Sequence, residues 1–99
     1  MFIPMLDSKI VGEVIAEFRK QKGMSQEVLS GLSDIGRPHL SMIERGERKP
    51  TLETLYRISL ALGVNMSEVV AEIEKRLWND GFVFAKPSFL YVYFYFCIC

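Results

Sequence analysis

The sequence has no cysteine before position 97 and only one histidine, His39. A disulfide-stapled secreted fold needs several spaced cysteines, so the first 96 residues exclude such a fold. Cys97 and Cys99 have no second pair of ligands, so we expect no metal site, and no motif indicates a cofactor. The formal net charge at pH 7 is zero, so the whole chain has no electrostatic attraction to nucleic acid or to a membrane surface.

The longest uninterrupted apolar run covers residues 89–99. A helix that crosses a bilayer needs about 20 apolar residues, so this run cannot span a membrane alone. The first residues of the sequence have no basic leader and no cleavage-site pattern, which argues against a signal peptide. We therefore expect a cytoplasmic protein that makes no membrane contact.

The composition divides the chain into two unequal parts. Residues 82–99 contain 15 apolar residues out of 18 and one charged residue, Lys86, whereas residues 1–81 contain 34 apolar residues out of 81. Nine of the 12 aromatic residues lie in residues 78–99. We therefore expect one globular domain over residues 1–78 and an apolar, aromatic C-terminal tail over residues 79–99.

Charge is also distributed unevenly along the chain. Residues 19–49 carry seven basic and four acidic residues, a net charge of +3. The flanking segments, residues 1–18 and 50–81, each have a net charge of −2. If the protein binds a polyanion, the middle third of the chain is therefore where the contact is expected.

Apolar residues recur at helical spacing in five segments, at about 8–22, 25–33, 37–45 and 52–62 and from 65 onward. The expected N-caps are Ser8, Ser25 and Thr51. The expected helix stops are Gly23, Gly46 and Gly63. Asn65 and Glu68 have the spacing of a capping box. The pattern predicts an all-α domain of five helices.

The apolar positions of these segments predict which side chains face the core. They are Leu29 and Leu32 in the second helix, Leu40 and Ile43 in the third, and Leu52, Leu55, Ile58 and Leu62 in the fourth. Only residues 34–36 separate the second helix from the third. Because so short a connection prevents antiparallel packing, we expect the two helices to cross steeply, as in a helix-turn-helix.

Several spaced motifs agree with one known family. They are Gly12-Glu13, FRKxKGMSQExL at 18–29, Ile35, Arg37, Leu40-Ser41, Ile43-Glu44-Arg45-Gly46, Pro50 to Leu55, and Leu60 to Val64. Over about residues 9–77 the chain resembles the Xre-type, phage lambda repressor/Cro-like helix-turn-helix DNA-binding family. The resemblance implies a five-helix domain that binds double-stranded DNA with its third helix in the major groove.

The resemblance also implies roles for individual residues. The implied base contacts are Arg37, Pro38 and Met42. Arginine bonds guanine O6 and N7 in a bidentate manner, whereas the other two cannot donate hydrogen bonds and would touch thymine methyls or shape the fit. The implied phosphate contacts are Gln26, His39, Ser41, Arg45, Arg48 and Lys49, which set position rather than sequence preference.

Two further residues of the motif have an implied structural role. Arg19 and Glu44 match positions where the family couples an arginine at the end of the first helix to a glutamate of the third, so we expect a partly buried ion pair. The family usually has glycine at position 34, where this chain has Asp34. Aspartate adopts the left-handed conformation more readily than most residues, so we expect the turn to be retained.

The family usually dimerises, so a homodimer that reads two half-sites is expected. The predicted interface lies on the fifth helix, at Val70, Ile73, Leu77 and Trp78, with a purely core role as the alternative for Ile73 and Leu77. The tail leaves four alternatives open: β-strand pairing across a dimer, a non-native extension, packing on its own domain, and insertion at a membrane surface.

No arrangement of residues resembles a nucleophile and its base, so no enzyme activity is expected. We expect no separate domain for a small-molecule ligand. The favoured function is a sequence-specific transcriptional regulator, a dimeric repressor reading an inverted-repeat operator through residues 37–45. The alternative is a protein- or membrane-interaction module that retains the fold and docks through the aromatic tail.

Overall fold

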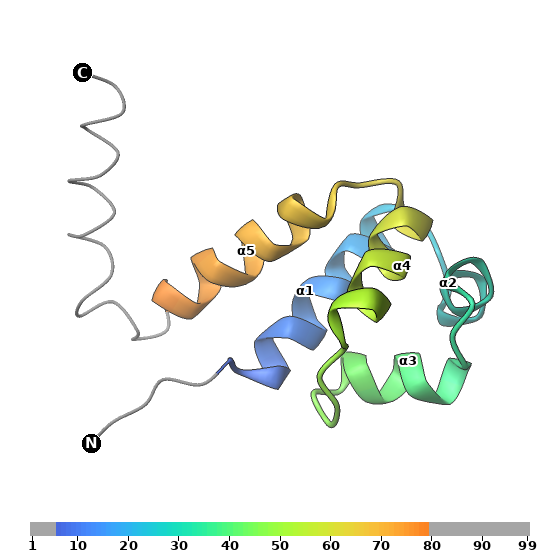
Figure 1. The fold of residues 1–99 in the computed structure, drawn as a ribbon, viewed down its shortest axis with the longest axis horizontal. Helices are drawn as coiled ribbons and strands as arrows, with labels where there is room; N and C mark the ends of the chain where they lie inside the picture. Colours follow the sequence, from blue (N-terminus) through green and yellow to red (C-terminus); the bar gives the residue numbers. More distant parts are fainter. Residues whose placement is uncertain (1–5, 80–99) are drawn as a thin grey trace.

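The computed structural model describes residues 6–79 and contains five helices in this range (Figure 1). They are α1 (Ser8–Gln21), α2 (Gln26–Ser33), α3 (Arg37–Glu44), α4 (Leu52–Leu62) and α5 (Met66–Asn79). The predicted all-α, five-helix architecture is confirmed. The predicted tail over residues 79–99, with β-strand pairing as one of its four alternatives, lies outside the described residues, apart from Asn79, which belongs to α5.

The helices pack around α1 and α4. α1 contacts α3 on one side and α5 on the other, while α2 packs against both α3 and α4. α3 lies at one end of the molecule, at the bottom of Figure 1, and the 45–51 loop that leads to α4 lies beside it. The fold thus holds a short helix at one edge with its outward face uncovered by the other described helices.

Local capping explains where most helices begin. The Ser25 hydroxyl accepts the Val28 N–H at 3.1 Å, and the Glu68 carboxylate accepts the Asn65 N–H at 2.8 Å. Thr51 caps α4 in the predicted manner. The predicted Ser8 cap is wrong, because Asp7 accepts the Lys9 N–H at 2.9 Å and Ser8 is already helical. A carboxylate at that position both accepts the bond and interacts favourably with the helix dipole.

Left-handed residues end α2 and α4. Gly63 follows α4 with φ of 76°, as its position predicted. Asp34 follows α2 with φ of 58° and ψ of 44°, the one described non-glycine residue with positive φ. Aspartate therefore takes the conformation that the family's glycine would take, and the tight α2–α3 turn is retained.

The core is one cluster of apolar side chains drawn from all five helices. Its fully buried large members are Val14, Ile15, Leu29, Leu40, Ile43, Ile58 and Val69. The predictions for Leu32 and Leu52 are wrong, since their exposed fractions are 62% and 72%.

Serine side chains explain the error at Leu32. α2 turns Leu29, Ser30 and Ser33 inward, and the Ser33 hydroxyl donates to the Leu29 carbonyl at 2.6 Å. Because this bond satisfies the hydroxyl, a polar side chain can be buried and Leu32 is left facing outward. Leu52 is the first residue of α4, and the buried side of that helix begins at Leu55.

Candidate nucleic-acid interface

α3 presents two different faces. Leu40 and Ile43 are fully buried beneath the helix, whereas Arg37 and Pro38 are exposed. The remaining outward positions, Ser41 and Met42, are half-buried, as is His39. Positions 37, 38, 41 and 42 share one side of an α-helix, so one face holds all three predicted base contacts.

A buried ion pair attaches α3 to α1. Arg19 and Glu44 form the expected pair, with Nε–Oε2 of 2.8 Å and Nη2–Oε1 of 3.0 Å. Their side chains are only 12% and 6% exposed. Arg19 Nη1 also donates to the Met24 carbonyl at 2.9 Å, so the guanidinium spans the α1–α2 turn as well. A bidentate pair at this depth fixes geometry, and removal of one partner would leave a buried charge unpaired.

Gln26 belongs to the same network. Its Nε2 donates to Glu44 Oε1 at 2.8 Å, so the first residue of α2 is tied to the last residue of α3. This hydrogen bond braces α3 against α2. The implied phosphate contact would use the same half-buried side-chain amide that already donates to Glu44.

A close backbone approach also sets the position of α3. A Cβ atom on Gly12 would lie 2.3 Å from the Ile43 carbonyl oxygen and 2.6 Å from that of Glu44. Real Cβ atoms do not come this close, so only glycine permits α1 and α3 to pack at this distance.

Three basic residues, Arg45, Arg48 and Lys49, follow α3 and are exposed. Arg45 is already occupied within the chain, because its Nε and Nη2 donate to Glu47 at 2.8 and 3.1 Å and Nη1 donates to the Ser41 hydroxyl. The hydrogen bonds from Arg45 hold the pKa of the Glu47 carboxyl below its ordinary value. Two of the predicted phosphate contacts, Ser41 and Arg45, therefore act as one unit next to an acidic side chain.

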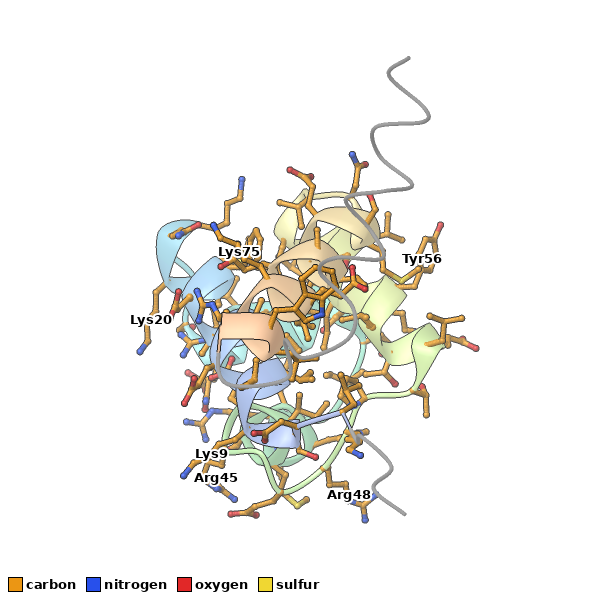
Figure 2. The ribbon with its side chains drawn as sticks, turned by 90° about the vertical axis from the view of Figure 1, so that its left-hand side faces the viewer. Lys9, Lys20, Arg45, Arg48, Tyr56 and Lys75 are labelled. Atoms are coloured by element: carbon orange, nitrogen blue, oxygen red, sulfur yellow. The ribbon has the colours of Figure 1, made fainter. Side chains whose placement is uncertain are left out.

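Lys9 is a basic residue at this edge that the sequence did not single out. A Cβ on Gly46 would lie 2.9 Å from the Lys9 Cα, so the first turn of α1 lies against the turn that follows α3. Lys9 is exposed, and Figure 2 shows it beside Arg45, with Arg48 at the same end of the molecule. The distribution of charge along the sequence could not show that Lys9 lies near Arg45, because the two residues are 36 positions apart.

The predicted interface residues of α5 differ in burial. Ile73 is 5% exposed and Leu77 packs against the core, which was the alternative for both. Val70 is 38% exposed and Trp78 is half-buried. The Ile73 side chain therefore packs in the core of its own domain, and its part in a dimer interface stays a prediction.

Two other kinds of functional feature are not found among the described residues. Within residues 6–79, no group of three or more His, Cys, Asp or Glu side chains is placed to hold a metal ion. No helix in that range combines the length and the apolar character needed to cross a bilayer.

Comparison with known proteins identifies the fold. The sequence model of a family described as helix-turn-helix matches residues 15–69. An uncharacterised HTH-type transcriptional regulator, y4dJ, of Sinorhizobium fredii is 40% identical over 68% of this chain and 87% of its own length. Control protein C.MunI of Mycoplasma sp is 40% identical over 72% of this chain and 99% of its own length. The crystal structure of the restriction-modification controller protein C.AhdI of Aeromonas hydrophila superposes with a TM-score of 0.63 at 32% identity, covering 66% of this chain and 98% of that one.

Proposed function

The chain belongs to the helix-turn-helix family, and we propose that it is a dimeric repressor that reads an inverted repeat in double-stranded DNA through α3. The family and the relatives make it a DNA-binding transcription regulator. Direct binding to DNA supports a place in the cytoplasm and a role without enzymatic activity, and we propose both for this chain.

The observation that carries the proposal is the rigidly held, outward-facing surface of α3. The buried Arg19–Glu44 pair and the close approach at Gly12 fix the helix, while Arg37 lies exposed in its first turn. A helix of eight residues presented this way fits the major groove, where its N-terminal side chains reach base edges.

The exposed basic residues around α3 support phosphate contacts. Arg45, Arg48 and Lys49 follow the helix, and Lys9 of α1 lies against the same turn (Figure 2). We assign Arg37, Pro38 and Met42 to base edges, and Gln26, His39, Ser41 and these four basic residues to the sugar–phosphate backbone.

A single α3 covers one half-site, so strong binding requires a second copy. Two α3 helices related by a two-fold axis would read half-sites about 34–36 Å apart on one side of the duplex. This spacing predicts an operator with two symmetric half-sites about one helical turn apart.

Selection from a random pool of duplex DNA tests the proposal. Purified full-length chain is incubated with the pool at several salt concentrations, and the bound fraction is sequenced. We expect enrichment of an inverted repeat with the stated half-site spacing. A bound fraction with no enriched sequence at any salt concentration would contradict sequence-specific regulation.

A further inference from the structure

α4 carries a row of large apolar side chains that the domain does not cover. Leu52, Tyr56 and Leu60 are 72%, 51% and 61% exposed. They follow one another at intervals of four residues, which places them on one side of the helix. Figure 2 shows the Tyr56 side chain pointing away from the body of the protein. Large apolar side chains gathered on one exposed face usually mark an interaction surface.

This row borders a shallow groove. The groove has a volume of about 490 Å³ and is lined by Leu52, Glu53, Tyr56, Arg57 and Met66. Its occupant must therefore offer apolar side chains for the row and charges for Glu53 and Arg57.

Glu53 and Arg57 make the edge of the row self-complementary. The two residues lie one turn apart on the same flank, and Arg57 Nη2 lies 2.9 Å from Glu53 Oε2. When two copies of a helix pack antiparallel about a two-fold axis, the same flank of each copy meets, with its sequence order reversed. Glu53 of one copy then faces Arg57 of the partner subunit, and the reverse pair forms at the other end.

We propose that α4 is the dimerisation helix, and that Leu52, Tyr56 and Leu60 pack against the same residues of a second copy with Glu53 and Arg57 paired across the interface. The inference rests on the proposed dimer and names the surface that forms it. It also moves the interface from α5, whose Ile73 and Leu77 are used by the domain core, to the neighbouring helix.

The first experiment compares two identical substitutions at equally exposed leucines. Leu60→Asp lies in the apolar row and Leu32→Asp lies on α2, with exposed fractions of 61% and 62%. Sedimentation of the full chain without DNA should show that Leu60→Asp raises the dimer dissociation constant at least about tenfold, whereas Leu32→Asp changes it less than about twofold. Equal effects of the two variants would overturn the assignment to α4.

The second experiment uses charge reversal. Glu53→Arg alone and Arg57→Glu alone each place like charges opposite one another, so each should weaken its own homodimer about fivefold. An equal mixture of the two variants forms a heterodimer in which both pairs are again opposite in sign, so its affinity should return to within about twofold of the wild type. Circular dichroism of each variant checks that the domain remains folded.

Each result has a defined meaning. The inference is overturned if the mixture of variants dimerises no more tightly than either variant alone. It is also overturned if the wild-type chain sediments as a monomer at every concentration. In that second case, the chain's own residues 82–99 become the candidate that covers the apolar row. Because sedimentation requires no DNA, the α4 interface can fail while the DNA selection succeeds, and the reverse is equally observable.

Discussion

At the residue scale, the exposed face of α3 separates side chains that read sequence from side chains that bind the backbone. Arg37 is exposed in the first turn of the helix, while Arg48 lies in the loop that follows it. An arginine that bonds a guanine edge affects one base pair, whereas an arginine on a phosphate affects all sequences alike.

Replacement of Arg37 tests this distinction. We expect Arg37→Ala to weaken binding to the selected operator by about 1–3 kcal/mol and to relax the preference at one base pair in each half-site. Arg48→Ala, the matched control, should weaken binding to all sequences uniformly. Titrations against operators substituted at each position measure both. A uniform loss for Arg37→Ala would make that residue a phosphate contact.

Glu47 is an exposed acidic residue bonded to one of the proposed backbone contacts, and it competes with DNA for Arg45. Two hydrogen bonds join the two side chains, and both are exposed. We expect Glu47→Gln to strengthen DNA binding by about threefold, because it frees the guanidinium and removes a charge that repels phosphate. Filter binding at fixed salt measures the change.

Glu72→Gln is the matched control for that prediction. It removes a carboxylate from another Arg–Glu pair, the one with Arg76 on α5, and changes the net charge equally. If it strengthens DNA binding as much as Glu47→Gln does, total charge rather than release of Arg45 explains the effect.

At the scale of elements, the packing of α1 on α3 depends on the missing side chain at Gly12. Gly12→Ala should lower the free energy of unfolding by about 1–3 kcal/mol, because the new methyl group meets two carbonyl oxygens of α3. Gly31→Ala in α2 meets nothing within 4 Å and should raise it by about 0.5–1 kcal/mol through helix propensity. Urea denaturation gives both values, and a stabilising Gly12→Ala would contradict the close approach.

An ion pair between Arg76 and Glu17 joins α5 to α1, and it depends on the ionised Glu17 carboxylate. Arg76 donates to Glu17 through both terminal nitrogens and to Glu72 through Nε. The hydrogen bonds that Arg76 donates to Glu17, together with the charges of Arg76 and Lys20, hold the pKa of Glu17 below its ordinary value of 4.5. A lowered folded-state pKa contributes stability above the unfolded value and loses it as the pH falls through the folded value.

The expected outcome is a pH-dependent difference between wild type and Glu17→Gln. The wild type should melt at a higher temperature at pH 7, and the difference should shrink as the pH falls below about 4.5 and disappear in stronger acid. Thermal melts followed by circular dichroism from pH 2 to pH 7 measure it. A difference independent of pH would mean that the carboxylate charge is not the cause.

At the scale of the whole molecule, a chain of zero net charge binds a polyanion because the exposed basic residues Lys9, Arg45 and Arg48 lie at one end (Figure 2). If the four basic contacts Lys9, Arg45, Arg48 and Lys49 act on each of two protomers, the logarithm of the binding constant should fall with the logarithm of salt concentration with a slope of about −7. Lys9→Ala should reduce this slope by about 2. Lys75→Ala, on α5 and far from that end in Figure 2, should leave it unchanged.

The elements were predictable because their signals are local. Periodicity and punctuation located all five helices, and Ser25, Thr51 and the Asn65–Glu68 pair cap as expected. The errors occurred where two adjacent residues were both suitable, as with Asp7 and Ser8, or where a bonded serine replaced a leucine in the core, as at Ser33. The Arg19–Glu44 pair was expected from the family resemblance alone, since nothing local links positions 25 residues apart.

The sequence by itself determined the helices, the family, the basic middle third and the residues on the outward face of α3, because helical spacing and capping act within a few residues. The tertiary structure alone decided that Lys9 joins Arg45, that Glu47 occupies Arg45, that Ile73 belongs to the core and that α4 keeps an uncovered apolar row. Each of these depends on how rigid helices pack against one another, and a burial pattern between elements is not encoded by the spacing within any one of them.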